Sequence, residues 1–256
     1  MNRVNSVSDC ISDEEKKQRT SITIVNSIVW LLLTISTAAT LGIFLVVIFI
    51  VWFTNWLLSE LNVRKLQLLG TSVSPEQFPE VYTAAREACT KLGVEELPRI
   101  IVINSGEMNA FALKFARKRV IVLLSRTLEG IIDNPAELRF LLGHELAHNV
   151  LNHGWRGTFE IYTSPAYKAA REMTCDNCGL AAADDISMAK QALKRLAVGN
   201  ELYTRIKDKH LEKEAEYIYS GLAGWLLKQQ ATYPSFGRRI SNIDQFAKTI
   251  GIQAAG

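Results

Sequence analysis

The residues best placed to do chemistry lie in one short segment, which reads His144-Glu145-Leu146-Ala147-His148 and fits the pattern H-E-x-x-H. Residues four apart on a helix differ by about 40° in direction, so the two histidines share one face. Two imidazoles one turn apart can bind a single zinc ion, and Glu145 can act as general base toward the water that such an ion activates. The segment therefore predicts the zinc-dependent hydrolysis that metallopeptidases perform.

The sequence around this pattern predicts a buried helix that presents both histidines. Asn134 can cap its start, Pro135 suits the first helical position, and Glu137 can complete a capping box. Apolar residues follow at helical spacing until Gly154, which can end the helix. Histidines on a buried face carry a desolvation cost unless a metal or a polar partner satisfies them, so these flanks favour zinc binding over a chance match.

A catalytic zinc ion typically has three protein ligands and one position for water, so a third ligand is needed. His153 lies about 140° round the helix from His148 and should point away, and Gly154 occupies the position of the third histidine of metzincins. Glu172 and Asp176 share one face of a later predicted helix. We expect Glu172 to be the third ligand and Asp176 to accept a hydrogen bond from a ligand histidine, which fixes its tautomer.

The cysteines leave a second zinc arrangement open. Cys175 and Cys178 form a C-x-x-C pair that could join the two histidines in a closed structural site. Such a site would leave Glu145 without a function and would have no position for a catalytic water. We therefore expect both cysteines to be small packing residues. The four cysteines of the chain predict no disulfide framework, which agrees with a cytoplasmic location.

An uncharged, largely apolar block runs from Ile22 to Leu58. It is too long for the core of a signal peptide, and its length lies between those of one and two membrane spans. Basic residues flank both ends, which favours a helical hairpin with both ends in the cytoplasm, turning within Thr34–Gly42, over one long tilted helix. Trp30, Trp52 and Trp56 suit the membrane interfaces.

The chain has 256 residues and a net charge of +3, which is too small to indicate nucleic-acid binding. We predict a short, mobile, polar tail over residues 1–21, a transmembrane hairpin or single span over 22–58, and one domain over 59–256. We expect the domain to be of the α+β class, mainly helical with a small sheet. Strands are predicted at 100–103, 109–112 and 119–124, a basic turn at Lys114–Lys118, and helices over 75–92, 164–183, 184–199, 201–230 and 240–250.

Several of these segments, taken in order, resemble the HtpX-like family of membrane zinc metalloproteases, which includes the CAAX prenyl protease. The resemblance runs from about Arg99 to Ile243, over half of the chain. It rests on five motifs: NAFA at 109–112, RVIVLLS at 119–125, ELRFLLGHELAH at 137–148, REMTCDNCG at 171–179 and YPSFGRRI at 233–240.

The resemblance implies a gluzincin domain that cleaves proteins or peptides with one Zn²⁺ per chain. It assigns the metal to His144, His148 and Glu172, the general base to Glu145, and a supporting contact to Asp176. It implies a membrane location, here the bacterial inner membrane, and a role in membrane protein quality control. The basic residues that flank the apolar block then put the catalytic domain in the cytoplasm.

The resemblance also implies which residues bind the substrate and where Arg239 lies. It implies that an edge strand formed by Asn109, Ala110, Phe111 and Ala112 pairs with extended substrate backbone. It places Arg239 near the site.

The sequence departs from the family pattern at several positions. Tyr233 stands where the family usually has histidine; with Arg239, its hydroxyl could stabilise a developing oxyanion. Met173 and Asn177 replace the usual aromatic and arginine residues. The short stretch between His148 and Glu172 indicates a compact member without an extra membrane pair. A different function, a zinc-dependent membrane-bound binding or chaperone-like module without turnover, would not need Glu145.

Overall fold

The computed structural model describes residues 4–40, 42–115, 118–153 and 164–252. This part of the chain is mainly helical and contains a four-stranded mixed sheet of order β1-β2-β4-β3, as the α+β prediction expects. Strand β4 is parallel to β2 and antiparallel to β3, and β1 is antiparallel to β2. The strands are β1 (Gly70–Ser72), β2 (Arg99–Ile103), β3 (Ala110–Phe115) and β4 (Lys118–Leu124).

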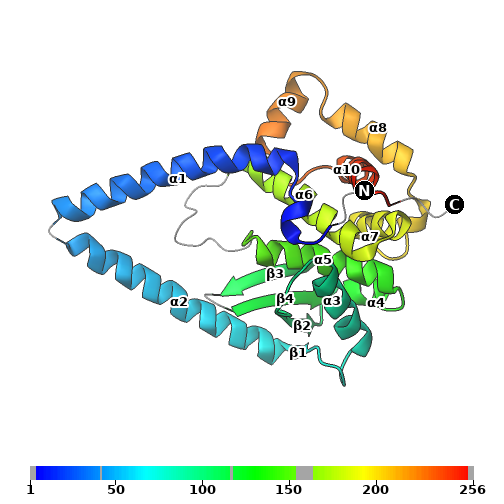
Figure 1. Ribbon diagram of the computed structural model, residues 1–256, viewed down its shortest axis with the longest axis horizontal. Helices are drawn as coiled ribbons and strands as arrows, with labels where there is room; N and C mark the ends of the chain where they lie inside the picture. Colours follow the sequence, from blue (N-terminus) through cyan, green and yellow to red (C-terminus); the bar gives the residue numbers. More distant parts are fainter. Residues whose placement is uncertain (1–3, 41, 116–117, 154–163, 253–256) are drawn as a thin grey trace.

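The helices fall into an N-terminal pair, a central pair and a surrounding group (Figure 1). The N-terminal pair is α1 (Asp13–Ala39) and α2 (Ile43–Leu69), and the central pair is α5 (Pro135–Val150) and α6 (Pro165–Ala183). The others are α3 (Pro79–Lys91), α4 (Ser125–Ile131), α7 (Ile186–Val198), α8 (Asp208–Ile218), α9 (Gly221–Gln230) and α10 (Phe236–Ile250), with 3₁₀ helices η1 (Val7–Cys10) and η2 (Tyr203–Arg205).

Strand β4 is apolar on both faces because helices cover the sheet on both sides. Successive side chains of a strand point to opposite faces. Ile121 and Leu123 belong to the core beneath α3 and α5, whereas Val120 and Val122 pack with Val63 from the last part of α2. Figure 1 shows that end of α2 lying against the sheet. The sheet therefore joins the N-terminal pair to the central one.

The central helices α5 and α6 cross at two glycines. A Cβ atom on Gly143 would lie 2.6 Å from the Ala182 Cβ, and one on Gly179 would lie 2.8 Å from the Phe140 carbonyl oxygen. Any larger residue would push the helices apart, so glycine is required for this close approach. Because α5 and α6 approach so closely, side chains on their facing sides can meet.

The N-terminal pair is a helical hairpin whose turn lies within the predicted segment Thr34–Gly42. Gly42 begins α2 with a φ of 87°, a left-handed conformation that suits glycine. Each helix is 27 residues long and apolar enough to cross a membrane, with 11% and 0% of its most apolar window buried. Large apolar side chains therefore cover the outside of the pair.

The segment before α1 packs against the domain. Val7 and Cys10 are buried in the main core. The Asn177 side chain donates to the Cys10 carbonyl at 2.9 Å, and the Ser12 N–H donates to the Thr174 hydroxyl at 3.0 Å. The prediction of a mobile tail is therefore wrong for the described residues from Val4 onward, because two small apolar side chains and backbone hydrogen bonds hold this polar segment on α6.

One predicted helix start and one predicted cap differ in detail. Ser74 and Gln77 exchange backbone hydrogen bonds in a turn, which delays the predicted helix to Pro79. Asn134 caps α5 as expected, but the Glu137 carboxylate accepts from Arg195 at 2.7 Å. That ion pair, which joins α5 to α7, replaces the predicted capping box.

Short elements were the hardest to predict, since strand β1 and helix α4 were not expected. Helix α5 ends at Val150, four residues before Gly154, so the helix end predicted at that glycine is wrong. The side chains of the basic turn Lys114–Lys118 lie outside the described part of the structure.

Candidate metal and active site

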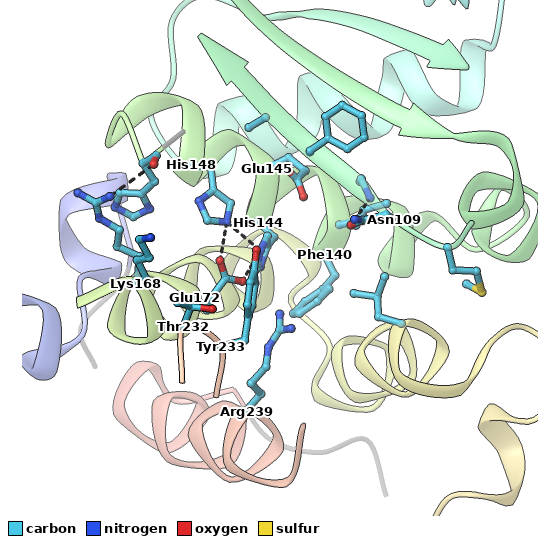
Figure 2. A pocket seen from close by; sticks show the side chains of 18 of the residues that line it. Asn109, Phe140, His144, Glu145, His148, Lys168, Glu172, Thr232, Tyr233 and Arg239 are labelled. Carbon is cyan, nitrogen blue, oxygen red and sulfur yellow. Dashed lines mark hydrogen bonds and ion pairs between the residues drawn. The ribbon is translucent and has the colours of Figure 1, made fainter. Parts of the chain in front are cut away.

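A cavity of about 570 Å³ lies between β3, α5, α6 and the start of α10 (Figure 2). It brings together residues as far apart in the sequence as Met108 and Arg239. Its lining includes all four residues of the predicted edge strand, together with His144, Glu145, His148, Glu172, Tyr233 and Arg239. Of the predicted site residues, only Asp176 lies behind the cavity wall rather than in it.

The three side chains of the predicted ligand set converge at one point. The Nε2 atoms of His144 and His148 lie 3.2 Å apart. The Glu172 carboxylate oxygens lie 3.6 Å from His144 Nε2 and 3.5 Å from His148 Nε2. Figure 2 shows this carboxylate facing both imidazoles across the α5–α6 crossing. Two imidazole nitrogens and a carboxylate are a donor set that suits zinc.

Asp176 and Arg239 fix the orientation of the first histidine. His144 Nδ1 lies 3.0 Å from Asp176 Oδ1. Arg239 donates to both oxygens of that carboxylate, from Nε at 2.7 Å and from Nη2 at 2.6 Å. Because Nδ1 faces a carboxylate, it carries a proton, and Nε2, directed toward Glu172 and His148, is the nitrogen that can lose its proton and offer a lone pair to a metal.

The charges of this cluster depend on one another. Burial lowers the pKa of His144, but hydrogen bonds to Asp176 and Glu172 outweigh it and raise this pKa to about 10. Burial and the positive charge of His144 lower the pKa of His148 to about 3. Burial opposes ionisation of Glu172, yet the two histidines lower its pKa to about 2. The arrangement thus stabilises positive charge between ionised carboxylates, as a cation site must.

Cys175 is a second candidate for the third ligand. His144, His148 and Cys175 have ligand atoms within 4.8 Å of one another. However, burial raises the pKa of the Cys175 thiol well above its usual value, and its Sγ lies 3.5 Å from His153 Nδ1. A protonated thiol is a poor ligand, so the geometry and charge favour Glu172. Cys178 packs elsewhere, 4.0 Å from the Val7 carbonyl oxygen.

Glu145 faces the cavity beside the edge strand. Burial raises the pKa of its carboxyl to about 7, and the backbone N–H of Ala112 donates a hydrogen bond to it. Among the described residues, its Oε2 atom is buried with no hydrogen-bond partner. Strand β3 forms the edge of the sheet, so Glu145 stands between the predicted ligands and an unpaired strand edge.

Tyr233 and Arg239 differ in how free they are to contact a substrate. Tyr233 is 66% exposed at the cavity, and the negative charge of Glu172 raises the pKa of its hydroxyl. Arg239 is buried and directs two of its nitrogens to Asp176. Figure 2 shows both side chains on the side of the cavity opposite β3.

His153 is closer to the site than its helical angle predicted. It lines the cavity, and its ring centroid lies 5.3 Å from that of His148. Its Nε2 atom lies 3.2 Å from Glu15 Oε1 at the start of α1. The chain leaves helical geometry after Val150, with Asn152 at a φ of 59°, and this turn brings His153 back. No sequence signal identified Glu15.

Comparisons with known proteins agree with this geometry. The chain is 27% identical over 220 residues to the "Plastoglobule-localized metallopeptidase 48, chloroplastic" of Arabidopsis thaliana, covering 74% of this chain and 63% of that protein. It is 35% identical over 115 residues to a "Protease HtpX homolog" of Bifidobacterium longum, covering 44% and 36%. A Thermodesulfovibrio yellowstonii protein of the same name is 33% identical over 76 residues, covering 30% and 26%.

These relatives confirm the resemblance to HtpX-like proteins, although the chain spans less than two thirds of the length of each. No solved structure matches the chain. The model of Peptidase family M48 matches residues 75–247, which include every predicted ligand and the edge strand. The chain therefore belongs to peptidase family M48.

Proposed function

We propose that this protein is a zinc-dependent endopeptidase of the gluzincin type that hydrolyses peptide bonds in protein substrates. One observation carries the proposal: the nitrogens of His144 and His148 and the carboxylate of Glu172 converge beside Glu145, whose buried oxygen faces the same cavity. A structural zinc site would need no such carboxylate. Family membership supports the same reading.

Each residue has a role that follows from its position. A bound zinc ion would supply Lewis acidity at the scissile carbonyl and at water. His144, His148 and Glu172 would hold it. Glu145 takes a proton from the attacking water and delivers it to the leaving amine; a pKa raised toward neutrality suits both transfers. Tyr233 directs its hydroxyl to the developing oxyanion.

Asp176 and Arg239 act through His144 rather than on the substrate. Their three hydrogen bonds hold the imidazole in one tautomer and one orientation. We assign Arg239 to this positioning, since two of its nitrogens already contact Asp176. In this proposal Tyr233 alone stabilises the oxyanion, whereas the sequence indicated both residues for that role.

The edge strand orients the substrate. Residues Asn109–Ala112 line the cavity on the free edge of the sheet, where an extended peptide can pair with the strand backbone. This mode recognises the backbone of a substrate rather than its side chains, which fits an enzyme that cleaves many different proteins.

We place the domain at a membrane, in a bacterium the inner membrane, with its catalytic part in the cytoplasm. The exposed apolar surface of α1 and α2 supports two spans within residues 22–58, leaving residues 59–256 as the peptidase domain. The predicted tail, residues 1–21, then lies on the cytoplasmic side with it, and two of its described residues, Cys10 and Ser12, contact α6. A role in membrane protein quality control would follow from this location.

The test is cleavage of an unfolded model protein by detergent-purified, zinc-loaded protein beside the variant Glu145→Gln. We expect the wild type to cut and the variant to lose at least about a thousandfold in rate while keeping its zinc. A variant that cuts normally would refute the assignment of the base. If neither cuts while both hold zinc, a binding or chaperone-like module without turnover replaces the peptidase.

A further inference from the structure

A second apolar surface lies outside the α1–α2 pair, on helices α8 and α9. Tyr217, Leu222 and Trp225 are 82%, 74% and 56% exposed, and Leu226 and Leu227 are also exposed. A surface helix of a soluble domain normally turns its apolar residues toward the core. Contiguous exposed apolar surface of this kind marks an interaction site.

The apolar face of α9 is directed away from the protein. Leu222, Trp225 and Leu226 are spaced three and four residues apart, so they share one side of the helix. Gly224, the buried residue of α9, lies on the opposite side. A Cβ atom there would come within 2.3 Å of the Tyr219 carbonyl carbon, so the glycine side of α9 packs against the corner that joins it to α8.

The corner between α8 and α9 is tied to the start of α1. The Tyr219 hydroxyl accepts from the Ser235 N–H at 3.0 Å, and the Arg238 guanidinium lies 5.9 Å from the Tyr219 ring centroid. Arg238 in turn pairs with Glu14 in the first turn of α1. Figure 1 shows α9 beside this end of α1, the helix that leads into the apolar pair.

The charge of this region suits an anionic surface. From residue 217 to residue 243 the sequence contains no Asp or Glu, and Lys228 is the single charged residue of α9. Basic residues near a bilayer are attracted to anionic headgroups, and Trp and Tyr are enriched at the membrane interface. An apolar face with an interfacial Trp and a flanking Lys is the composition of helices that lie in the plane of a membrane surface.

We propose that the outward face of α9, formed by Leu222, Trp225 and Leu226, enters the headgroup region of the bilayer that α1 and α2 cross. This rests on the proposed membrane anchoring but not on peptidase activity. Thr232 and Tyr233 follow α9 directly and line the cavity. The cavity mouth is thereby held at the bilayer surface, where it receives extended segments that emerge from the membrane.

The test uses an environment-sensitive fluorophore on Leu226→Cys in the full chain, with one chain per nanodisc of phosphatidylcholine and phosphatidylglycerol. All four native cysteines are buried, so a maleimide probe labels the introduced thiol. We expect blue-shifted emission that nitroxide lipids labelled near the headgroup quench. The matched control, Lys209→Cys at the exposed start of α8, should show neither effect.

Equal emission from both positions, without quenching, would overturn the proposal even if the protein remains in the discs. Protein that fails to remain with the discs would instead refute the anchoring itself. A blue shift seen only in discs holding two chains would assign the face of α9 to a second copy and would also overturn the lipid proposal.

Discussion

The helix pairs α5–α6 and α1–α2 depart from an ordinary soluble domain in opposite ways. The first buries ionisable groups, among them His144, Glu145, Glu172 and Asp176, whereas the second exposes Leu, Ile, Val and Phe along most of its length. Soluble domains normally bury apolar side chains and expose charged ones. Each pair is therefore matched to a partner that is not protein, which we propose to be a cation for one and lipid for the other.

The two helix pairs differ in how precisely their side chains must be placed. A buried charge costs several kcal/mol unless its partners are well placed, so α5–α6 depends on individual hydrogen bonds. Contact with lipid is non-directional and scales with apolar area. We expect single polar substitutions to disable the central pair, while the N-terminal pair tolerates apolar exchange and fails only when a charge is introduced.

The largest effect should come from removing the carboxylate of the ligand set. Glu172→Ala leaves two histidines and no anionic ligand, so we expect zinc content measured by mass spectrometry after dialysis to fall from about one ion per chain to near zero. The double variant Cys175→Ser with Cys178→Ser is the matched control and should keep its zinc. The reverse pattern would establish the closed structural site instead.

A charge in the N-terminal pair tests the lipid side of the comparison. Ile50 is exposed in the apolar part of α2. Ile50→Arg should disfavour insertion by about 3 kcal/mol, which is roughly a hundredfold shift toward protein extractable by alkaline carbonate. Ile50→Leu should behave as the wild type. If the arginine variant stays fully in the membrane fraction, α2 is not a span.

A smaller effect should follow from weakening the support of His144. Asp176→Asn keeps the shape of the side chain but removes the charge that holds His144 and pairs with Arg239. We expect zinc affinity, measured by competition with a chelator, to fall about 10- to 100-fold. Asp208→Asn removes a carboxylate that pairs with lysines of α7, and it should leave the affinity unchanged.

The smallest expected effect is the number of protons that the protein releases when it binds zinc. In the metal-free protein the pKa of His144 is raised to about 10, so this residue is charged at pH 8. Binding a cation through Nε2 requires the neutral ring, so zinc uptake at pH 8 should release about one proton and affinity should rise with pH. Calorimetry in two buffers of different ionisation enthalpy measures this number. Zinc uptake without proton release would mean that His144 binds no metal.

The sequence predicted the elements whose ends carry local signals. Asn134 and Ser164 cap α5 and α6 through their own side chains, and both helices begin where expected. The ligand spacing followed from helical periodicity, which is also local. The edge strand and the position of Arg239 came with the family resemblance, and the structure places both at the cavity.

What the sequence did not reveal depends on contacts between distant residues. Glu15 reaches His153 across 138 positions, and no pattern near either residue indicates the pair. Helix α4 and strand β1 are too short for periodicity to identify. The N-terminal segment looks like a solvated tail because, among its described residues, only Val7 and Cys10 are buried hydrophobics.

The contact between Ser12 and Thr174 joins two segments that the ribosome makes at different times. The two residues are 162 positions apart. At ribosomal rates of about 5–20 residues per second, helix α6 follows the segment before α1 by roughly ten to thirty seconds. During that interval α1 and α2 are made, while the α6 residues that hydrogen-bond to their N-terminal flank do not yet exist. If α1 and α2 are the membrane spans that we propose, they can insert before the rest of the domain closes around their base.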